Sequence, residues 1–181
     1  MIIILTQCFP SRIGGIESLV SNLALELSKT EKIIVFADRH HFFNDSVFDD
    51  QYKNQILVRR IGGLKFFRRR KKIKEIKPFV DSKKVKLVIS DSWKSLEIGI
   101  DYLNIKKIPT VCLAHGNEFL SEKTSKIKRI KTTLKKISLV VANSKFTKNL
   151  VTNLDIPNLK VAYVYPGAID LRNQNTVELK N

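Results

Sequence analysis

Short apolar runs alternate with amphipathic segments along the whole chain, and few folds accommodate such a pattern. The runs are four to six residues long, rich in isoleucine and valine, and mostly without alternating polar residues. Strands that are buried on both faces show this pattern, whereas half-exposed strands alternate apolar and polar side chains. We therefore expect buried strands at residues 2–5, 33–36, 56–61, 85–89, 110–113, 139–142 and 161–165.

Helical periodicity appears between several of these runs. Apolar side chains recur at helical spacing within segments 16–27, 96–103, 127–137 and 146–154. A repeated order of strand and helix is typical of a parallel sheet with helices on both faces. The sequence therefore predicts an α/β fold: a Rossmann-like, doubly wound, mostly parallel sheet of about seven strands flanked by helices.

The length of 181 residues suits one domain of this kind. We expect the domain to occupy residues 1–170, with residues 171–181 as a polar tail or a truncated interdomain linker. The polar segment 40–54 is predicted to form a loop or a short helical excursion.

The composition excludes several classes of protein. With 43% hydrophobic and 28% charged residues, the chain has enough apolar material for a core and is not disordered throughout. No apolar run approaches the roughly 20 residues of a membrane-spanning helix, and the apolar opening is too short for a signal-peptide core. Cys8 and Cys112 are too few for a disulfide framework and lack metal-ligand spacing. We expect a cytoplasmic protein with no metal site and no tightly bound cofactor.

Basic residues outnumber acidic ones by 33 to 17, which gives a net charge of +16. Such a surplus indicates an anionic partner, such as a membrane surface, a nucleic acid or a phosphorylated small molecule. Basic and aromatic residues are concentrated in segment 65–77, which has the profile of a helix lying on an anionic membrane. The predicted membrane-surface residues are Lys65, Phe66, Phe67, Arg68, Arg69, Arg70, Lys71 and Lys72.

Two other interpretations of the charge stay open. The basic residues can be ordinary solvated helix faces, since a lysine-rich composition produces these without any ligand. Three arginines beside paired phenylalanines also fit a nucleic-acid surface. No nucleic-acid-binding motif accompanies them, so nucleic acid is not the expected partner.

Ligands of open α/β sheets bind at the carboxyl ends of the strands, so the residues that follow each run are the candidates for ligand contact. The first run leads to Gly14 and Gly15 at the start of a predicted helix. Glycines let a ligand approach the backbone closely, and a helix start attracts an anion. The spacing is not the dinucleotide-binding fingerprint, and a plain turn explains the glycines equally well.

Polar residues also follow the later runs. After the fifth run, His115 is placed to face the cleft, where its imidazole can donate to a hydroxyl or a phosphate. Asn117 and Glu118 can bind sugar hydroxyls, although Asn117 also suits a helix cap. Asn143 and Ser144 follow the sixth run, and we expect at least one of them to cap a helix.

Asp91 and Trp93 follow the fourth run and are further candidates for ligand contact. The indole of Trp93 can stack on a sugar ring, or it can cover the edge of the sheet. The sequence alone leaves both roles open.

Four motifs together carry a resemblance to a known family. They are Gly-Gly-x-Glu at 14–17, His-Gly-x-Glu at 115–118, Val-Ala-Asn-Ser-x-Phe-Thr at 141–147 and Tyr-Pro-Gly-x-x-Asp at 165–170. In this order, and spanning nearly the whole chain, they resemble the amino-terminal half of family 4 glycosyltransferases, which have the GT-B fold.

The resemblance implies a retaining transfer of sugar from a UDP- or GDP-sugar to a carbohydrate or lipid-linked acceptor, such as a cell-envelope glycan. It implies that Gly14 and Gly15 approach the donor diphosphate and that His115 is the catalytic residue beside the reacting sugar. The candidate acceptor contacts are Arg12, Glu17, Asp91, Trp93, Asn117, Glu118, Asn143 and Ser144.

The chain departs from the family because the donor-binding domain is missing from it. Catalysis between two domains needs both walls of the cleft to exclude water and to align the reactants. We therefore expect little activity from the chain alone, a donor-binding domain or subunit as its partner, and a location at the inner face of the cell membrane. The alternatives are a non-catalytic subunit that anchors a split glycosyltransferase to the membrane, and a basic α/β module that binds nucleotides or nucleic acid.

Overall fold

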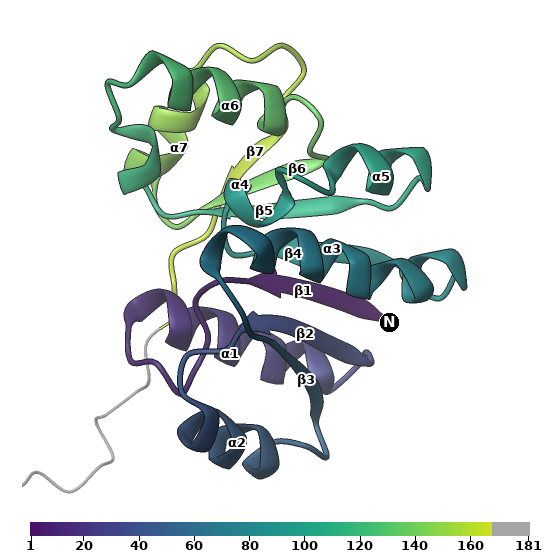
Figure 1. Cartoon of the computed structure of the whole chain (residues 1–181). Helices are drawn as coiled ribbons and strands as arrows, with labels where there is room; N and C mark the ends of the chain where they lie inside the picture. The colour runs from purple at the N-terminus through teal and green to yellow at the C-terminus, as the bar shows by residue number, and fades with distance from the viewer. Residues whose placement is uncertain (168–181) are drawn as a thin grey trace, which may run out of the picture.

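The computed structural model describes residues 1–167, which form a seven-stranded parallel sheet flanked by helices (Figure 1). The strand order is β3-β2-β1-β4-β5-β6-β7, and every neighbouring pair is parallel. This confirms the predicted doubly wound α/β fold, with a sheet that is parallel throughout. The strands are β1 (Ile2–Thr6), β2 (Ile33–Asp38), β3 (Ile56–Ile61), β4 (Leu87–Ser90), β5 (Thr110–Ala114), β6 (Leu139–Ala142) and β7 (Val161–Tyr163).

Helices connect the strands in chain order. They are α1 (Gly15–Ser28), α2 (Phe42–Gln51), α3 (Lys65–Asp81), α4 (Trp93–Leu96), α5 (Ile100–Ile105), the 3-10 turn η1 (Asn117–Phe119), α6 (Thr124–Leu134) and α7 (Lys145–Thr152). The segment predicted as a loop or short excursion contains the regular helix α2. The predicted boundary at residue 170 and the tail over 171–181 lie outside the described residues.

Strands β1 to β5 are rich in apolar residues because each contributes to two cores, one on either face of the sheet. In β1, Ile3 and Leu5 belong to one buried cluster, and Ile2 and Ile4 belong to the other. Since successive side chains of a strand point to opposite faces, this arrangement needs an unbroken apolar run. Helices α3 to α7 pack into the first cluster, whereas α1 and α2 contribute to the second.

A buried lysine ties helix α3 to the sheet. Lys72 is 2% exposed, and its ammonium group lies 2.5 Å from Oδ1 of Asp38 and donates to the carbonyl of Thr6. Burial lowers the pKa of Lys72, although the carboxylate of Asp38 favours the charged form. The prediction that Lys72 faces a membrane is therefore wrong: its charge joins the carboxyl ends of β1 and β2 to α3.

We expect Lys72→Met to lower the free energy of unfolding by about 3 kcal/mol, because it leaves a buried carboxylate without its closest cation. The control is Lys71→Met, which removes the same charge from the neighbouring exposed position and should change stability by less than about 0.5 kcal/mol. Urea denaturation of both variants measures the difference. Equal losses in the two variants would contradict the structural role of Lys72.

Candidate functional site

The parallel strands bring the segments that follow them to one edge of the sheet. β1 and β4 are neighbours in the middle of the strand order, and the chain leaves them towards α1 on one face and α4 on the other. This is the switch point at which ligands bind in doubly wound sheets. The residues after β1, β4, β5, β6 and β7 meet at this edge.

Asp91, directly after β4, fixes the loop that follows β1. Its Oδ2 accepts hydrogen bonds from the backbone N–H of Gln7 at 2.7 Å and from Oγ1 of Thr6 at 2.9 Å. Its Oδ1 accepts from Oγ of Ser95 at 2.6 Å. Asp91 is 2% exposed, so its carboxylate serves the fold and is not placed to contact an acceptor, contrary to the sequence-based expectation.

A second buried carboxylate holds the same loop from the other side. Asp45, on α2, accepts from Oγ of Ser11 at 2.9 Å and from the backbone N–H of His40 at 2.9 Å, and lies 3.6 Å from Nη1 of Arg60. Burial opposes ionisation of Asp45, but these hydrogen bonds and the charge of Arg60 outweigh it, so its pKa is lowered. Sequence patterns did not single out Asp45, because it lies in a polar segment without a motif.

The loop after β1 ends in two glycines, Gly14 before α1 and Gly15 as its first residue, and their surroundings differ. A Cβ atom on Gly14 would lie 2.2 Å from Oε2 of Glu17, so this glycine makes room for that carboxylate. Glu17 is itself buried and pairs with Arg12 at 3.1 Å. A Cβ atom on Gly15 would meet nothing within 4 Å, so the first residue of α1 faces open space. The exposed helix start can receive an anion.

Cys8, in the same loop, is not a nucleophile. Burial, helped by the charges of Asp91 and Glu17, raises the pKa of its thiol to about 11. The thiolate, which is the reactive form, is therefore not populated at neutral pH.

His115 is fixed by hydrogen bonds to two neighbouring segments. Its Nε2 lies 2.9 Å from the carbonyl oxygen of Asp91, and its backbone N–H donates to Oε1 of Glu118 at 3.0 Å. A carbonyl oxygen only accepts, so Nε2 carries the hydrogen and Nδ1 of the neutral ring is an acceptor. The half-buried ring can thus receive a hydrogen bond from a substrate hydroxyl through Nδ1.

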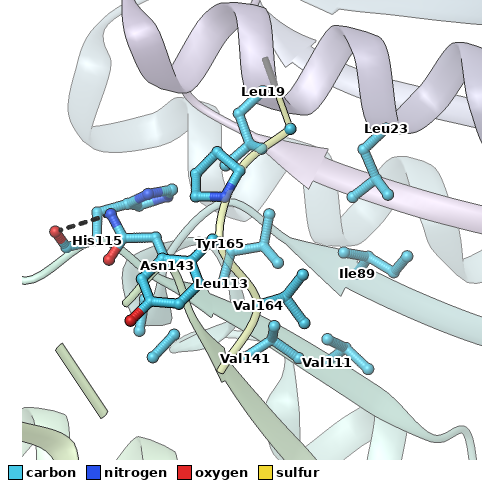
Figure 2. A pocket seen from close by; sticks show the side chains of 14 residues that line it. Leu19, Leu23, Ile89, Val111, Leu113, His115, Val141, Asn143, Val164 and Tyr165 are labelled. Carbon is cyan, nitrogen blue, oxygen red and sulfur yellow. Dashed lines mark hydrogen bonds between the residues drawn. The ribbon is translucent and has the colours of Figure 1, made fainter. Parts of the chain in front are cut away.

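The residues after β6 complete this network. The side-chain amide of Asn143 donates to the carbonyl of His115 at 3.4 Å (Figure 2). Ser144 caps α7 by accepting from the backbone N–H of Thr147 at 3.1 Å. This confirms the expected cap and leaves Asn143 as the residue that links β6 to His115.

Not every predicted residue belongs to this cluster. The prediction that Trp93 contacts an acceptor is wrong, because the indole is 1% exposed and packs in the core of the face covered by α3 to α7. Asn117 is exposed in η1, and Glu118 is half-buried beneath the backbone of His115.

An apolar groove of about 310 Å³ opens beside His115 and Asn143 (Figure 2). Its floor consists of Ile89, Val111, Leu113 and Val141 from the face of the sheet that α1 and α2 cover only in part. Leu19 and Leu23 of α1 form one wall, and Val164 and Tyr165 line the side formed by the segment after β7.

The described residues contain neither a candidate metal site nor a candidate membrane span. No group of three or more histidine, cysteine or acidic side chains in residues 1–167 is arranged to hold a metal ion. No helix in this part of the chain is long and apolar enough to cross a membrane.

The structure is thus a doubly wound α/β domain with a glycine-containing helix start and a histidine at its switch point. The profile of Glycosyltransferase Family 4 matches residues 13–171, and the chain belongs to this family. The resemblance seen in the four motifs is thereby confirmed, and the chain corresponds to the amino-terminal region of the family.

Several solved structures with the same fold are longer than this chain. HepE from Anabaena, in complex with UDP and glucose, has a TM-score of 0.68 and 17% identity over 93% of this chain and 45% of its own. Sucrose-phosphate synthase from Thermosynechococcus elongatus has a TM-score of 0.69 and 13% identity over 91% of this chain and 47% of its own. The lipopolysaccharide outer core galactosyltransferase WaaB has a TM-score of 0.60 and 15% identity over 91% of this chain and 45% of its own.

At these identities the likeness concerns the fold. The chain spans somewhat less than half the length of the structures that it matches. None of the curated proteins with which the sequence was compared matches it.

We expect Asp45→Asn to destabilise the fold at neutral pH by about 2 kcal/mol, because a buried hydrogen-bonded charge is lost. The pKa of Asp45 is below the usual 3.8, so its stabilisation is present above that pH and disappears as the pH falls through the folded-state pKa. The stability difference between wild type and variant, measured by urea denaturation, should therefore narrow as the pH is lowered from neutral to about 3.

The matched control is Asp50→Asn on the same helix, where the side chain is 76% exposed. It should change stability by less than about 0.5 kcal/mol at every pH. If the stability difference between wild type and Asp45→Asn did not depend on pH, the ionised carboxylate of Asp45 would not be what holds the loop.

Proposed function

We propose that this chain is the acceptor-binding half of a retaining glycosyltransferase that uses a UDP- or GDP-sugar and works only together with a donor-binding half. The observation that carries the proposal is the junction of the glycine-bearing helix start, His115 and Asn143 at one edge of the sheet in a member of family 4. The proposed acceptor is a carbohydrate or a lipid-linked glycan of the cell envelope.

In this proposal each part of the edge has a chemical role. The start of α1, open at Gly15, faces the diphosphate of the donor, where its backbone N–H groups and partial positive charge stabilise the leaving group. His115 lies at the reacting sugar, where its Nδ1 accepts a hydrogen bond from a sugar hydroxyl. The predicted acceptor contacts that are exposed or only half-buried are Arg12, Asn117, Glu118, Asn143 and Ser144.

Exposed apolar side chains around this edge support the presence of a second domain or subunit. Ile13 is 97% exposed and Phe146 is 64% exposed, and both follow strands at the carboxyl edge. The groove beside His115 adds partly covered apolar sheet residues to the same region. We infer from these exposed apolar side chains that another domain or subunit covers parts of this edge.

The donor-binding half that we propose is supplied either by the same polypeptide or by a separate one. Without it the donor has one wall of its cleft, and water is not excluded from the reacting sugar. The chain alone is therefore expected to be inactive.

The proposal predicts that His115→Ala lowers sugar transfer by at least about 100-fold in the presence of the donor-binding half. The control is His41→Ala, which removes an exposed histidine after β2 and should change the rate by less than about twofold. Transfer from radiolabelled donors to a membrane-extract acceptor is the measurement, and circular dichroism checks that both variants fold. Transfer that is unaffected by His115→Ala would remove this residue from the reaction.

A further inference from the structure

The first turn of α3 exposes apolar and basic side chains side by side. Leu64, Phe66 and Phe67 are 74%, 61% and 55% exposed, far more than the apolar residues further along the helix, such as Ile73 and Ile76 at 6% and 0%. The helix thus has a buried half that packs on the sheet and an apolar start that is largely exposed.

The structure divides the basic residues of this helix into two groups. Arg68 donates to the carbonyl of Gly63 at 2.7 Å, and Arg69 pairs with Glu97 at 2.7 Å. These two arginines are bonded within the fold but are only partly buried, so their predicted place at a membrane surface stays a prediction, and they are left out of the surface defined below.

The other basic residues, Lys65, Arg70 and Lys71, are exposed. They lie within the same two turns as the apolar side chains, and the guanidinium of Arg70 lies 5.0 Å from the centre of the Phe66 ring. We call this surface the α3 tip. It consists of Leu64, Lys65, Phe66, Phe67, Arg70 and Lys71.

We infer that the α3 tip binds the surface of a bilayer that contains anionic phospholipids. Leu64, Phe66 and Phe67 would enter the interface, where exposed apolar side chains lose contact with water. The three cations would face the lipid phosphates, and the net charge of +16 would attract the whole chain to such a surface.

The geometry favours lipid over nucleic acid. The rings of Phe66 and Phe67 are 5.4 Å apart and nearly perpendicular, at 87°, so they do not form a platform on which successive bases can stack. An exposed leucine beside them contributes to burial in a bilayer interface but offers nothing to a base edge.

The α3 tip lies at the same edge of the sheet as the candidate site, but the inference that it binds a membrane does not depend on the proposed function. α3 follows β3, so its first turn lies at the carboxyl edge of the sheet, the edge that holds the candidate site (Figure 1). A bilayer bound at the tip would lie next to this edge. Membrane binding can therefore be tested without any transfer assay, and its failure would leave the proposed transfer chemistry standing.

The experiment is flotation of the full chain with vesicles of phosphatidylcholine alone or of an equimolar mixture of phosphatidylcholine and phosphatidylglycerol. We expect flotation only with the mixed vesicles, and weaker binding at high salt because the Debye length shortens. Phe66→Ser combined with Phe67→Ser should reduce binding by about tenfold or more, since the apolar contribution is lost.

Charge is tested with two triple variants that change the net charge equally. Lys65→Glu, Arg70→Glu and Lys71→Glu together should abolish flotation. Lys128→Glu, Lys131→Glu and Lys135→Glu together alter exposed positions at α6 and should retain most of the binding. Ile105→Ser, at a side chain that is 78% exposed on α5, is the matched control for the phenylalanines.

Several results would overturn the inference. One is the absence of flotation with the mixed vesicles, and another is an equal loss of binding in the α6 variant, which would indicate diffuse attraction by net charge. A third is binding of polyuridylic acid that requires the α3 tip in a chain that does not float, which would assign this surface to nucleic acid.

Discussion

The arrangement of the site depends on one buried carboxylate. Asp91 receives hydrogen bonds from the loop after β1 through its side chain, and its backbone carbonyl lies against the imidazole of His115. It therefore connects the ends of three strands, β1, β4 and β5, with one residue. A buried carboxylate that is fully hydrogen-bonded fixes its neighbours firmly, because each lost partner would leave a charge without compensation. The parallel strands place the helix start at Gly15 and the ring of His115 at one edge, and Asp91 fixes the loop after β1 and the ring there.

Buried charge also explains how so basic a chain uses its cations. Lys72, Arg60 and Arg69 each pair with an acidic side chain inside the fold or at its margin. Other basic residues are exposed on α3 and α6, among other places, where they are available to an anionic partner. Composition alone could not separate these two uses of lysine and arginine.

The sequence predicted the parts of the structure that depend on local pattern. The apolar runs identified the strands because β1 to β5 contribute to cores on both faces of the sheet. A cap at Asn143 or Ser144 was expected from their place between a strand and a helix. The parts that depend on long-range contacts were missed or mistaken. Asp45 and Lys72 gain their roles from partners on other elements, and Trp93 follows a strand yet turns into the core. Nothing in the neighbouring residues indicates these choices.

The central claim is that this chain is one wall of a cleft for sugar transfer and that a donor-binding half supplies the other wall. The most direct measurement is the transfer of labelled sugar from UDP- and GDP-sugars by the chain alone, by the donor-binding half alone and by the two together. The account predicts transfer only by the combination, because one wall neither holds the donor against the acceptor nor excludes water. Transfer by the chain alone, at the rate of the combination, would contradict it.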